Sequence, residues 1–180
     1  RLFRQVRMRI ALLTLYLLAA GAAWAGDETA NDAATTRMQA ISFSEWDAIL
    51  ESQLGSITVV DFWASWCTPC IERFPHMVEM HHAYQEKGVR FISLNLDEQG
   101  DTESIDWCND FLADTKAVFA NYHMDENMSE AFERLDLLSL PTVRIYTTGG
   151  AEAYRLSGDN PYKQFTKKDV EQALLELLQR

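Results

Sequence analysis

Two short apolar runs, at residues 57–63 (ITVVDFW) and 89–96 (VRFISLNL), enclose a segment whose apolar residues recur at helical spacing. Runs of this length, rich in β-branched and aromatic residues, are typical of strands buried inside a sheet. The enclosed segment, residues 68–87, ends at Gly88, a residue that often terminates a helix. Such a strand–helix–strand unit constrains the chain to the α/β class.

The same alternation continues on both sides of this unit. A helix is expected to open near Phe43 with Ser44 as its N-cap, and Pro75 is expected to kink the 68–87 helix. The further expected elements are helices at 102–112, 127–135 and 167–179, and strands near 117–120, 142–147 and 153–156. The last two strands flank Gly149-Gly150, which predicts a hairpin. The sequence therefore predicts a three-layer α/β/α sandwich around a central mixed sheet.

The N-terminal residues have the pattern of a leader. Arginines precede an apolar run at 10–23, and Ala-Trp-Ala at 23–25 fits a cleavage site, so residues 1–25 are predicted to be a secretory signal peptide. An uncleaved membrane anchor is the alternative. Residues 26–37 are small and polar and are expected to be a flexible linker, which leaves one domain at 38–180.

Without residues 1–25 the chain carries 12 basic and 27 acidic residues, a net charge of −15. This balance argues against binding nucleic acid or an anionic membrane surface, both of which need a basic footprint. Twelve of the acids fall within residues 97–136. They predict either a solvated acidic face or a docking surface for a basic partner.

Two of the three cysteines, Cys67 and Cys70, form a C-x-x-C motif. Structural zinc would need two more ligands at suitable spacing, but Cys108 stands alone and His123 lies fifteen residues beyond it. A structural disulfide would close too small a loop to stabilise the fold through chain entropy. An exchange of electrons is the interpretation with the strongest chemical basis.

The motif lies where a predicted strand passes into a predicted helix. Cys67 at the helix N-terminus would have its thiolate stabilised by free N–H groups and the helix dipole. Cys70 lies one turn later and is expected to be more shielded. Cys67 is therefore the predicted nucleophile and Cys70 the resolving thiol, and Pro69 fixes the first turn.

VVDFWASWCTPC at 59–70, the proline five residues after the second cysteine (Pro75), and Leu140-Pro141-Thr142 before a strand resemble the thioredoxin superfamily. The resemblance covers residues 40–179. It implies that the bond before Pro141 is cis and that Pro141 packs against the disulfide. It also implies that the Leu140 backbone binds a substrate chain.

The resemblance also assigns roles to residues around the pair. Asp61 resembles the buried acid that helps to deprotonate the resolving thiol. Ser93 stands where thioredoxins have a lysine, so the pKa of Asp61 is expected to be still higher without that partner. Trp66 is expected to form part of the substrate-binding rim, together with Thr68 and Pro69 between the cysteines.

About 25 additional residues, at 100–121, separate this chain from the cytoplasmic thioredoxins. With the leader, this insertion resembles the exported TlpA-like thiol–disulfide oxidoreductases, including those serving cytochrome c maturation. That branch usually has asparagine where this chain has Asp61. The resemblance implies a periplasmic reductase of disulfide-bearing proteins that needs no cofactor and draws electrons from a membrane donor.

Three alternatives stay open at this point. Cys67, Cys70 and His81, near the methionines of MVEMHH (77–82), would suit copper delivery. The pair would also suit a disulfide oxidase or isomerase, or a binding module whose disulfide is static. Cys108 is expected to be a free buried thiol, with a regulatory or intermolecular role as its alternative.

Overall fold

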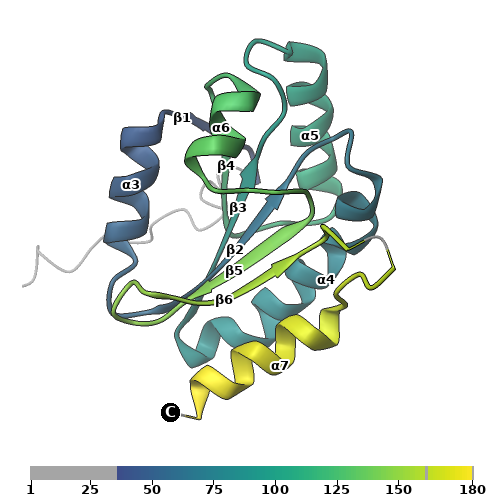
Figure 1. Ribbon diagram of the computed structural model, residues 1–180. Helices are drawn as coiled ribbons and strands as arrows, with labels where there is room; N and C mark the ends of the chain where they lie inside the picture. The colour runs from purple at the N-terminus through teal and green to yellow at the C-terminus, as the bar shows by residue number, and fades with distance from the viewer. Residues whose placement is uncertain (1–35, 161, 180) are drawn as a thin grey trace, which may run out of the picture. The chain divides into compact units, whose positions relative to one another are not determined.

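The computed structural model describes residues 36–160 and 162–179, in which strands and helices alternate (Figure 1). The elements are β1 (Gln39–Ile41), α3 (Phe43–Ser52), β2 (Ile57–Trp63), α4 (Thr68–Tyr84), the 3-10 turn Gln85–Lys87, β3 (Val89–Asn95), α5 (Thr102–Asp114), β4 (Ala120–Met124), α6 (Met128–Arg134), β5 (Thr142–Tyr146), β6 (Glu152–Ser157) and α7 (Lys167–Leu178). The predicted signal peptide and all but the last two residues of the predicted linker lie outside the described residues.

The strands form one six-stranded sheet in the order β1-β4-β3-β2-β5-β6. Strands β1, β4, β3 and β2 pair in parallel, whereas β5 and β6 run antiparallel to their neighbours. Central β2 pairs along its whole length with β3, from Ile57 opposite Val89 to Trp63 opposite Asn95. The predicted mixed sheet is confirmed.

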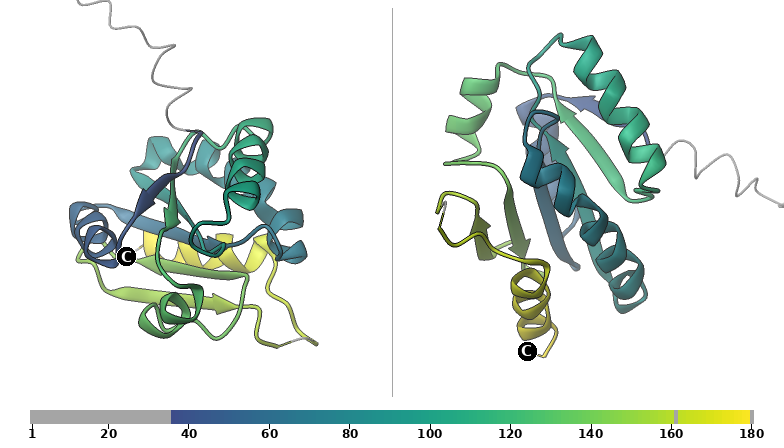
Figure 2. Two further views of the ribbon diagram at one scale, coloured as in Figure 1. Left: turned by 90° about the horizontal axis from the view of Figure 1, so that it is seen from above. Right: turned by 90° about the vertical axis from the view of Figure 1, so that its right-hand side faces the viewer.

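Helices cover both faces of this sheet, as Figures 1 and 2 show. Because side chains alternate along a strand, Val59 and Trp63 point to the face packed by α4, α5 and α7, and Val60 and Phe62 point to the face packed by α3 and α6. The architecture is therefore the predicted three-layer α/β/α sandwich.

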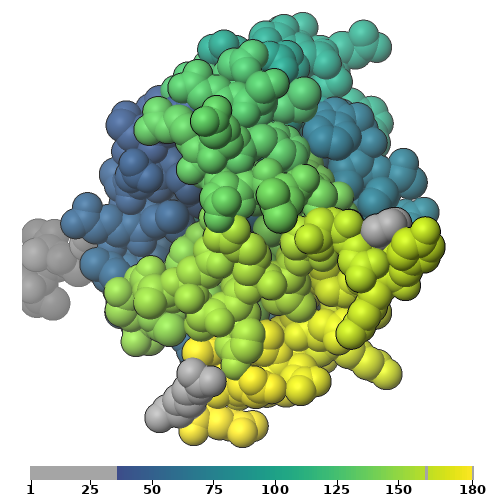
Figure 3. Space-filling view, viewed as in Figure 1, coloured from purple at the N-terminus to yellow at the C-terminus, as the bar shows by residue number. Residues whose placement is uncertain are grey.

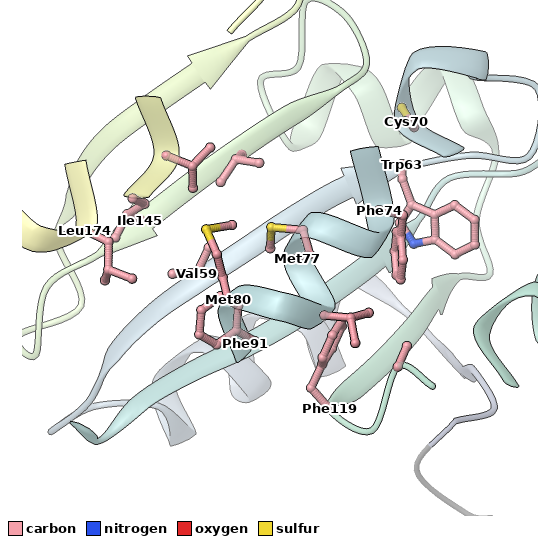
Figure 4. Close-up of a cluster of buried hydrophobic side chains, with 14 of the residues drawn as sticks. Val59, Trp63, Cys70, Phe74, Met77, Met80, Phe91, Phe119, Ile145 and Leu174 are labelled. Atoms are coloured by element: carbon pink, nitrogen blue, oxygen red, sulfur yellow. The ribbon is translucent and has the colours of Figure 1, made fainter. Parts of the chain in front are cut away.

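The larger apolar cluster lies between α4 and the sheet (Figure 4). Phe74, Met77 and Met80 of α4 are at most 2% exposed and contact residues of β2, β3, β5 and α7. Burying a side chain of this size contributes about 1.5–3 kcal/mol. This packing fixes α4, and with it the position of the cysteine pair at its start.

Two local predictions were wrong, and one short strand was missed. Ser42, not Ser44, caps α3, since its hydroxyl accepts from Glu45 N–H while the Glu45 carboxylate accepts from Ser42 N–H. The strand predicted at 117–120 lies instead at Ala120–Met124. The three-residue strand β1 was not predicted at all, because its QAI sequence has too little pattern to be recognised.

Within residues 36–160 and 162–179, none of the helices has both the length and the apolar character that crossing a bilayer requires.

Candidate active site

The cysteine pair lies at the start of α4. Cys67 is the N-cap residue, and its sulfur is joined to that of Cys70 in a disulfide with Cα atoms 5.2 Å apart. The N–H groups of Cys70 and Ile71 donate to the Cys67 carbonyl, at 2.9 and 3.1 Å, and close the first turn. Cys67 is 5% exposed and Cys70 only 1%. The Cys67 side chain caps no N–H group of its own, so the helix N-terminus is free to stabilise a thiolate there.

The carboxyl ends of β2 and β3 place this turn at the edge of the sheet. Leu96, just after β3, donates its N–H to the carbonyl of Trp63, the last residue of β2, at 2.8 Å. Three residues, 64–66, then lead to Cys67. Sites at the carboxyl ends of parallel strands are common in open α/β sheets.

One buried and one exposed tryptophan lie next to the cysteine pair in the chain. Trp63 is fully buried and its ring lies 5.0 Å from that of Phe74 and 5.7 Å from that of Phe111 in the inserted helix α5. Trp66 is 55% exposed, and Thr68 and Pro69 are exposed as well. The surface around the cysteines therefore offers apolar contacts to a second molecule.

Asp61 lies on the face of β2 that α4 covers, and it is 2% exposed. Its strand neighbours are Ser93 on β3 and Val143 on β5, and the Ser93 hydroxyl donates to Asn121 instead. The sequence did not predict a cationic partner for Asp61 from another element, but Arg73 of α4 approaches it to 3.6 Å, between Nη2 and Oδ1. Burial raises the pKa of Asp61 to about 6, although the Arg73 charge opposes that shift.

Leu140 and Pro141 lie at the start of β5, and the peptide bond between them is cis. The loop after β6 closes over this segment, since Gly158 N–H donates to the Pro141 carbonyl at 2.8 Å. A Cβ atom at Gly158 would lie 2.9 Å from Pro141 Cδ, closer than any ordinary contact. Only glycine therefore allows this approach.

A groove of about 300 Å³ joins the two segments, with Pro69 on one side and Pro141 on the other. Figure 3 shows the segment that joins β6 to α7 (yellow-green to yellow) beside the steel-blue segment at the start of α4. Arg73 and Phe165 form part of the groove wall. An extended chain in this groove would pass next to the disulfide.

A buried network at Asp97, which the sequence did not predict, holds the loop before Cys67. The Asp97 carboxylate accepts from Ser65 N–H at 2.9 Å, Ser65 Oγ at 2.6 Å and Asn95 Nδ2 at 2.7 Å. Cys108 of α5 donates its thiol to the same carboxylate at 3.3 Å, and burial raises its pKa. The inserted helix is thereby tied to the active-site loop, and Cys108 is a free buried thiol as predicted.

Asp97→Asn should lower the free energy of unfolding by about 1–2 kcal/mol. One acceptor oxygen is replaced by an NH₂ group that faces the donors of Ser65 or Asn95, and a buried unmatched donor costs this much. Urea unfolding of the oxidised protein measures the change. The matched control is D101N at the exposed N-cap of α5, where the N–H and hydroxyl groups of Ser104 donate to the side chain. An equal loss there would contradict the special role of the buried network.

The residues that suggested copper delivery do not gather at the cysteines. Met77 and Met80 belong to the core, and no group of three or more His, Cys, Asp or Glu side chains in the described residues is arranged to hold a metal ion. His81 is eleven residues beyond Cys70 on the same helix, a separation of about 16 Å along the axis. It packs against Phe119 instead, with ring centroids 5.4 Å apart.

Comparisons with known proteins agree with this geometry. Residues 37–107 match the Thioredoxin family. The thiol-disulfide oxidoreductase ResA of Bacillus anthracis is 41% identical over 49 residues, which cover 27% of this chain and 28% of the relative. The sporulation thiol-disulfide oxidoreductase A of Bacillus subtilis is 24% identical over 135 residues, covering 73% of this chain and 79% of the relative.

Among solved structures, one from Chlorobium tepidum, described as a thiol:disulfide interchange protein DsbE, aligns with a TM-score of 0.57 at 30% identity. The alignment covers 72% of this chain and 84% of that structure. The match to the ResA relative is shorter, since this chain spans 28% of its length.

Proposed function

Because the chain belongs to the thioredoxin superfamily, in its TlpA-like branch, we propose that it is a thiol–disulfide oxidoreductase that reduces disulfides of other proteins. The observation that carries this proposal is the Cys67–Cys70 disulfide at the N-terminus of α4, beside the groove between Pro69 and Pro141. A dithiol placed this way combines a stabilised thiolate with a site for a polypeptide substrate.

The reaction begins with the reduced pair. The Cys67 thiolate attacks one sulfur of a substrate disulfide, the substrate S–S bond breaks, and the other substrate sulfur leaves as a thiolate. Cys70 then loses its proton to the Asp61 carboxylate and attacks Cys67. The mixed disulfide breaks, the Cys67–Cys70 disulfide forms, and the substrate leaves with both sulfurs reduced.

The surface around Cys67 supports a role for a protein substrate. Pro69 and Pro141 line the groove. Trp66 and Thr68 are exposed just before Pro69 in the chain, and Leu140 directly precedes Pro141. We propose that they bind an extended segment around the substrate cysteine. Apocytochromes c, whose cysteines must be reduced before haem attachment, are one proposed substrate class.

The proposed location is the periplasm, on the basis of the leader pattern at residues 1–25. Disulfides persist in that compartment, so the pair would be oxidised after each turnover and would need electrons from outside. We therefore propose a membrane protein as electron donor. The reaction itself uses no bound cofactor.

The reduction potential of the Cys67–Cys70 pair tests the proposed direction of electron flow. Equilibration with dithiol buffers, followed by counting of free thiols by mass spectrometry, should give a value near or below that of thioredoxin, about −270 mV. A value near that of strong periplasmic oxidants, about −120 mV, would instead assign the protein as a disulfide donor.

A further inference from the structure

Arg73 brings a positive charge close to Asp61, the acid proposed to take the proton of Cys70. It follows Cys70 by three residues in the first turns of α4, and residues at this spacing share one face of a helix. That face is turned toward the sheet. Packing of this face against the sheet brings the Arg73 side chain to Asp61 of β2.

The guanidinium group is held in a fixed place. Its carbon lies 4.2 Å from the centre of the Phe165 ring, and the side chain is 16% exposed. Nη2 lies 3.6 Å from Asp61 Oδ1, which is longer than a hydrogen bond. Asp61 Oδ1 and Arg73 Nη1 have no hydrogen-bond partner within the described part of the chain. The interaction between the two groups is therefore electrostatic, and it stabilises the ionised form of each.

No other charged side chain described in the structure approaches Asp61. The residues next to it in the sheet register are Ser93 and Val143, and its neighbours on the same face of β2 are Val59 and Trp63. Among the described residues, Arg73 is the one group whose charge lowers the pKa of Asp61, and Asp61 is the one group whose charge raises the pKa of Arg73. The two form an isolated buried pair.

We propose that Arg73 is a positioning residue for resolution of the mixed disulfide, because its charge keeps the Asp61 carboxylate ionised at neutral pH and able to accept the Cys70 proton. This inference rests on the proposed function. In the resolving step the proton passes from Cys70 Sγ to Asp61, the Cys70 thiolate attacks Cys67, and the bond from Cys67 to the substrate sulfur breaks. Arg73 exchanges neither protons nor electrons.

The expected effect of removing this charge follows from the distance. An opposite charge within about 4–6 Å shifts the pKa of a carboxyl by about 1–3 units. In R73M the midpoint of the pH profile for resolution should therefore rise by at least about one pH unit. A rise of one to two units leaves between about half and about a tenth of the Asp61 carboxyl ionised at pH 7, so the step should be about two- to tenfold slower there than in the wild type. At pH 9 the two rates should be nearly equal.

Stopped-flow reaction of the reduced protein with 4,4′-dithiodipyridine measures this step directly. The probe is uncharged above about pH 6, so Arg73 does not attract it electrostatically. Attack by Cys67 releases a first thiopyridone, and attack by Cys70 on the Cys67 adduct releases a second with first-order kinetics. Only the second phase should depend on Arg73, and the profile is recorded from pH 6 to pH 9.

Two variants separate the charge of Arg73 from its bulk and from a general effect of losing an arginine. R73K keeps the charge and should retain most of the wild-type rate at pH 7. R90M removes an exposed arginine at the amino end of β3 and should leave both phases unchanged. If R73K is as slow as R73M, the charge is not the cause and the proposal is overturned.

A double-mutant cycle asks whether Arg73 acts through Asp61. D61N should slow the second phase and flatten its pH profile, and R73M/D61N should match D61N within about twofold. A further loss in the double variant would mean that Arg73 acts on Cys70 directly, which contradicts the proposal. Because R73M/D61N buries no unpaired charge, we expect it to fold even if R73M alone folds poorly. It can then still be compared with D61N.

Carbon-13 NMR of the Asp61 carboxyl supplies a readout independent of the reaction. Its titration midpoint should rise in R73M and stay close to wild type in R73K. A shifted midpoint without a slower second phase would make the pair structural only. Failure of the wild type to reduce insulin would contradict the proposed function, but these two measurements would still decide the role of Arg73.

Discussion

Replacing Cys67 with serine should abolish disulfide reduction, with a loss of more than about a thousandfold in the rate of insulin reduction. Neither of the other described cysteines can take its place, since Cys70 is only 1% exposed and Cys108 is buried and donates to Asp97. Loss of a nucleophile has effects of this size in other enzymes. Cys70→Ser should block a later step of the reaction. Its Cys67 still attacks, but nothing resolves the product, so a mixed disulfide with the substrate should accumulate.

Non-reducing electrophoresis and intact-mass measurement distinguish the two variants. C70S should gain the mass of the bound substrate, and dithiothreitol should release it, whereas C67S should gain none. The matched control is C108S, which keeps a short hydrogen-bonding side chain in place of the third cysteine. Its rate of insulin reduction should stay within about twofold of the wild-type rate. Accumulation of the adduct in C67S rather than C70S would reverse the assigned roles.

The stability of the oxidised protein should depend on pH through Asp61. Burial raises the folded-state pKa of this carboxyl from 3.8 to about 6, so the folded protein holds the proton more tightly than the unfolded chain. The Asp61 contribution is therefore fully present below about pH 4 and is lost as the pH rises through about 6. With about 1.4 kcal/mol per pKa unit, the loss is about 3 kcal/mol.

The difference between D61N and the wild type isolates this contribution from those of the other carboxylates. Urea unfolding of both proteins at pH 4 and pH 7 should show D61N gaining about 2.4 kcal/mol on the wild type over that interval, because part of the full difference develops below pH 4. D47N, on the exposed surface of α3, should show no comparable gain. An equal pH dependence in D61N and the wild type would mean that Asp61 stays ionised in the folded protein throughout this range.

Much of the fold could be predicted because its central elements have strong local patterns. The β2 strand has the predicted bounds, and α7 lies within the helix predicted at 167–179. Its buried residues recur at helical spacing: Val170, Ala173, Leu174 and Leu177. The edge of the sheet at β1 and β4 was harder to predict. The position of β4 is set by pairing with β3 and β1 rather than by its own sequence, ANYHM, which mixes polar and apolar residues.

The residues of the site also differ in how far the sequence alone could identify them. Cys67 and Cys70 were identifiable because the motif and its place between a strand and a helix occur in consecutive residues. The partner of Asp61 was not, because Arg73 belongs to another element and reaches Asp61 only when α4 packs across β2. A signal was present, since an arginine three residues after Cys70 would lie on the same helix face, but its target depends on tertiary structure. The same reason explains why the Asp97–Ser65 contact, across 32 residues, was missed.

The place of β4 in the sheet has a consequence for how the molecule opens. Within the described residues, strand β1 pairs with β4 alone, over three residues and across a sequence separation of about 80. It therefore closes a long loop for few hydrogen bonds, and we expect it to open locally at a low cost in free energy. Because β4 and β3 separate β1 from β2, the edge can fray without disturbing the strand that leads to Cys67. Mechanical tension applied at the N-terminal side would thus be absorbed at this edge before it reached the redox centre.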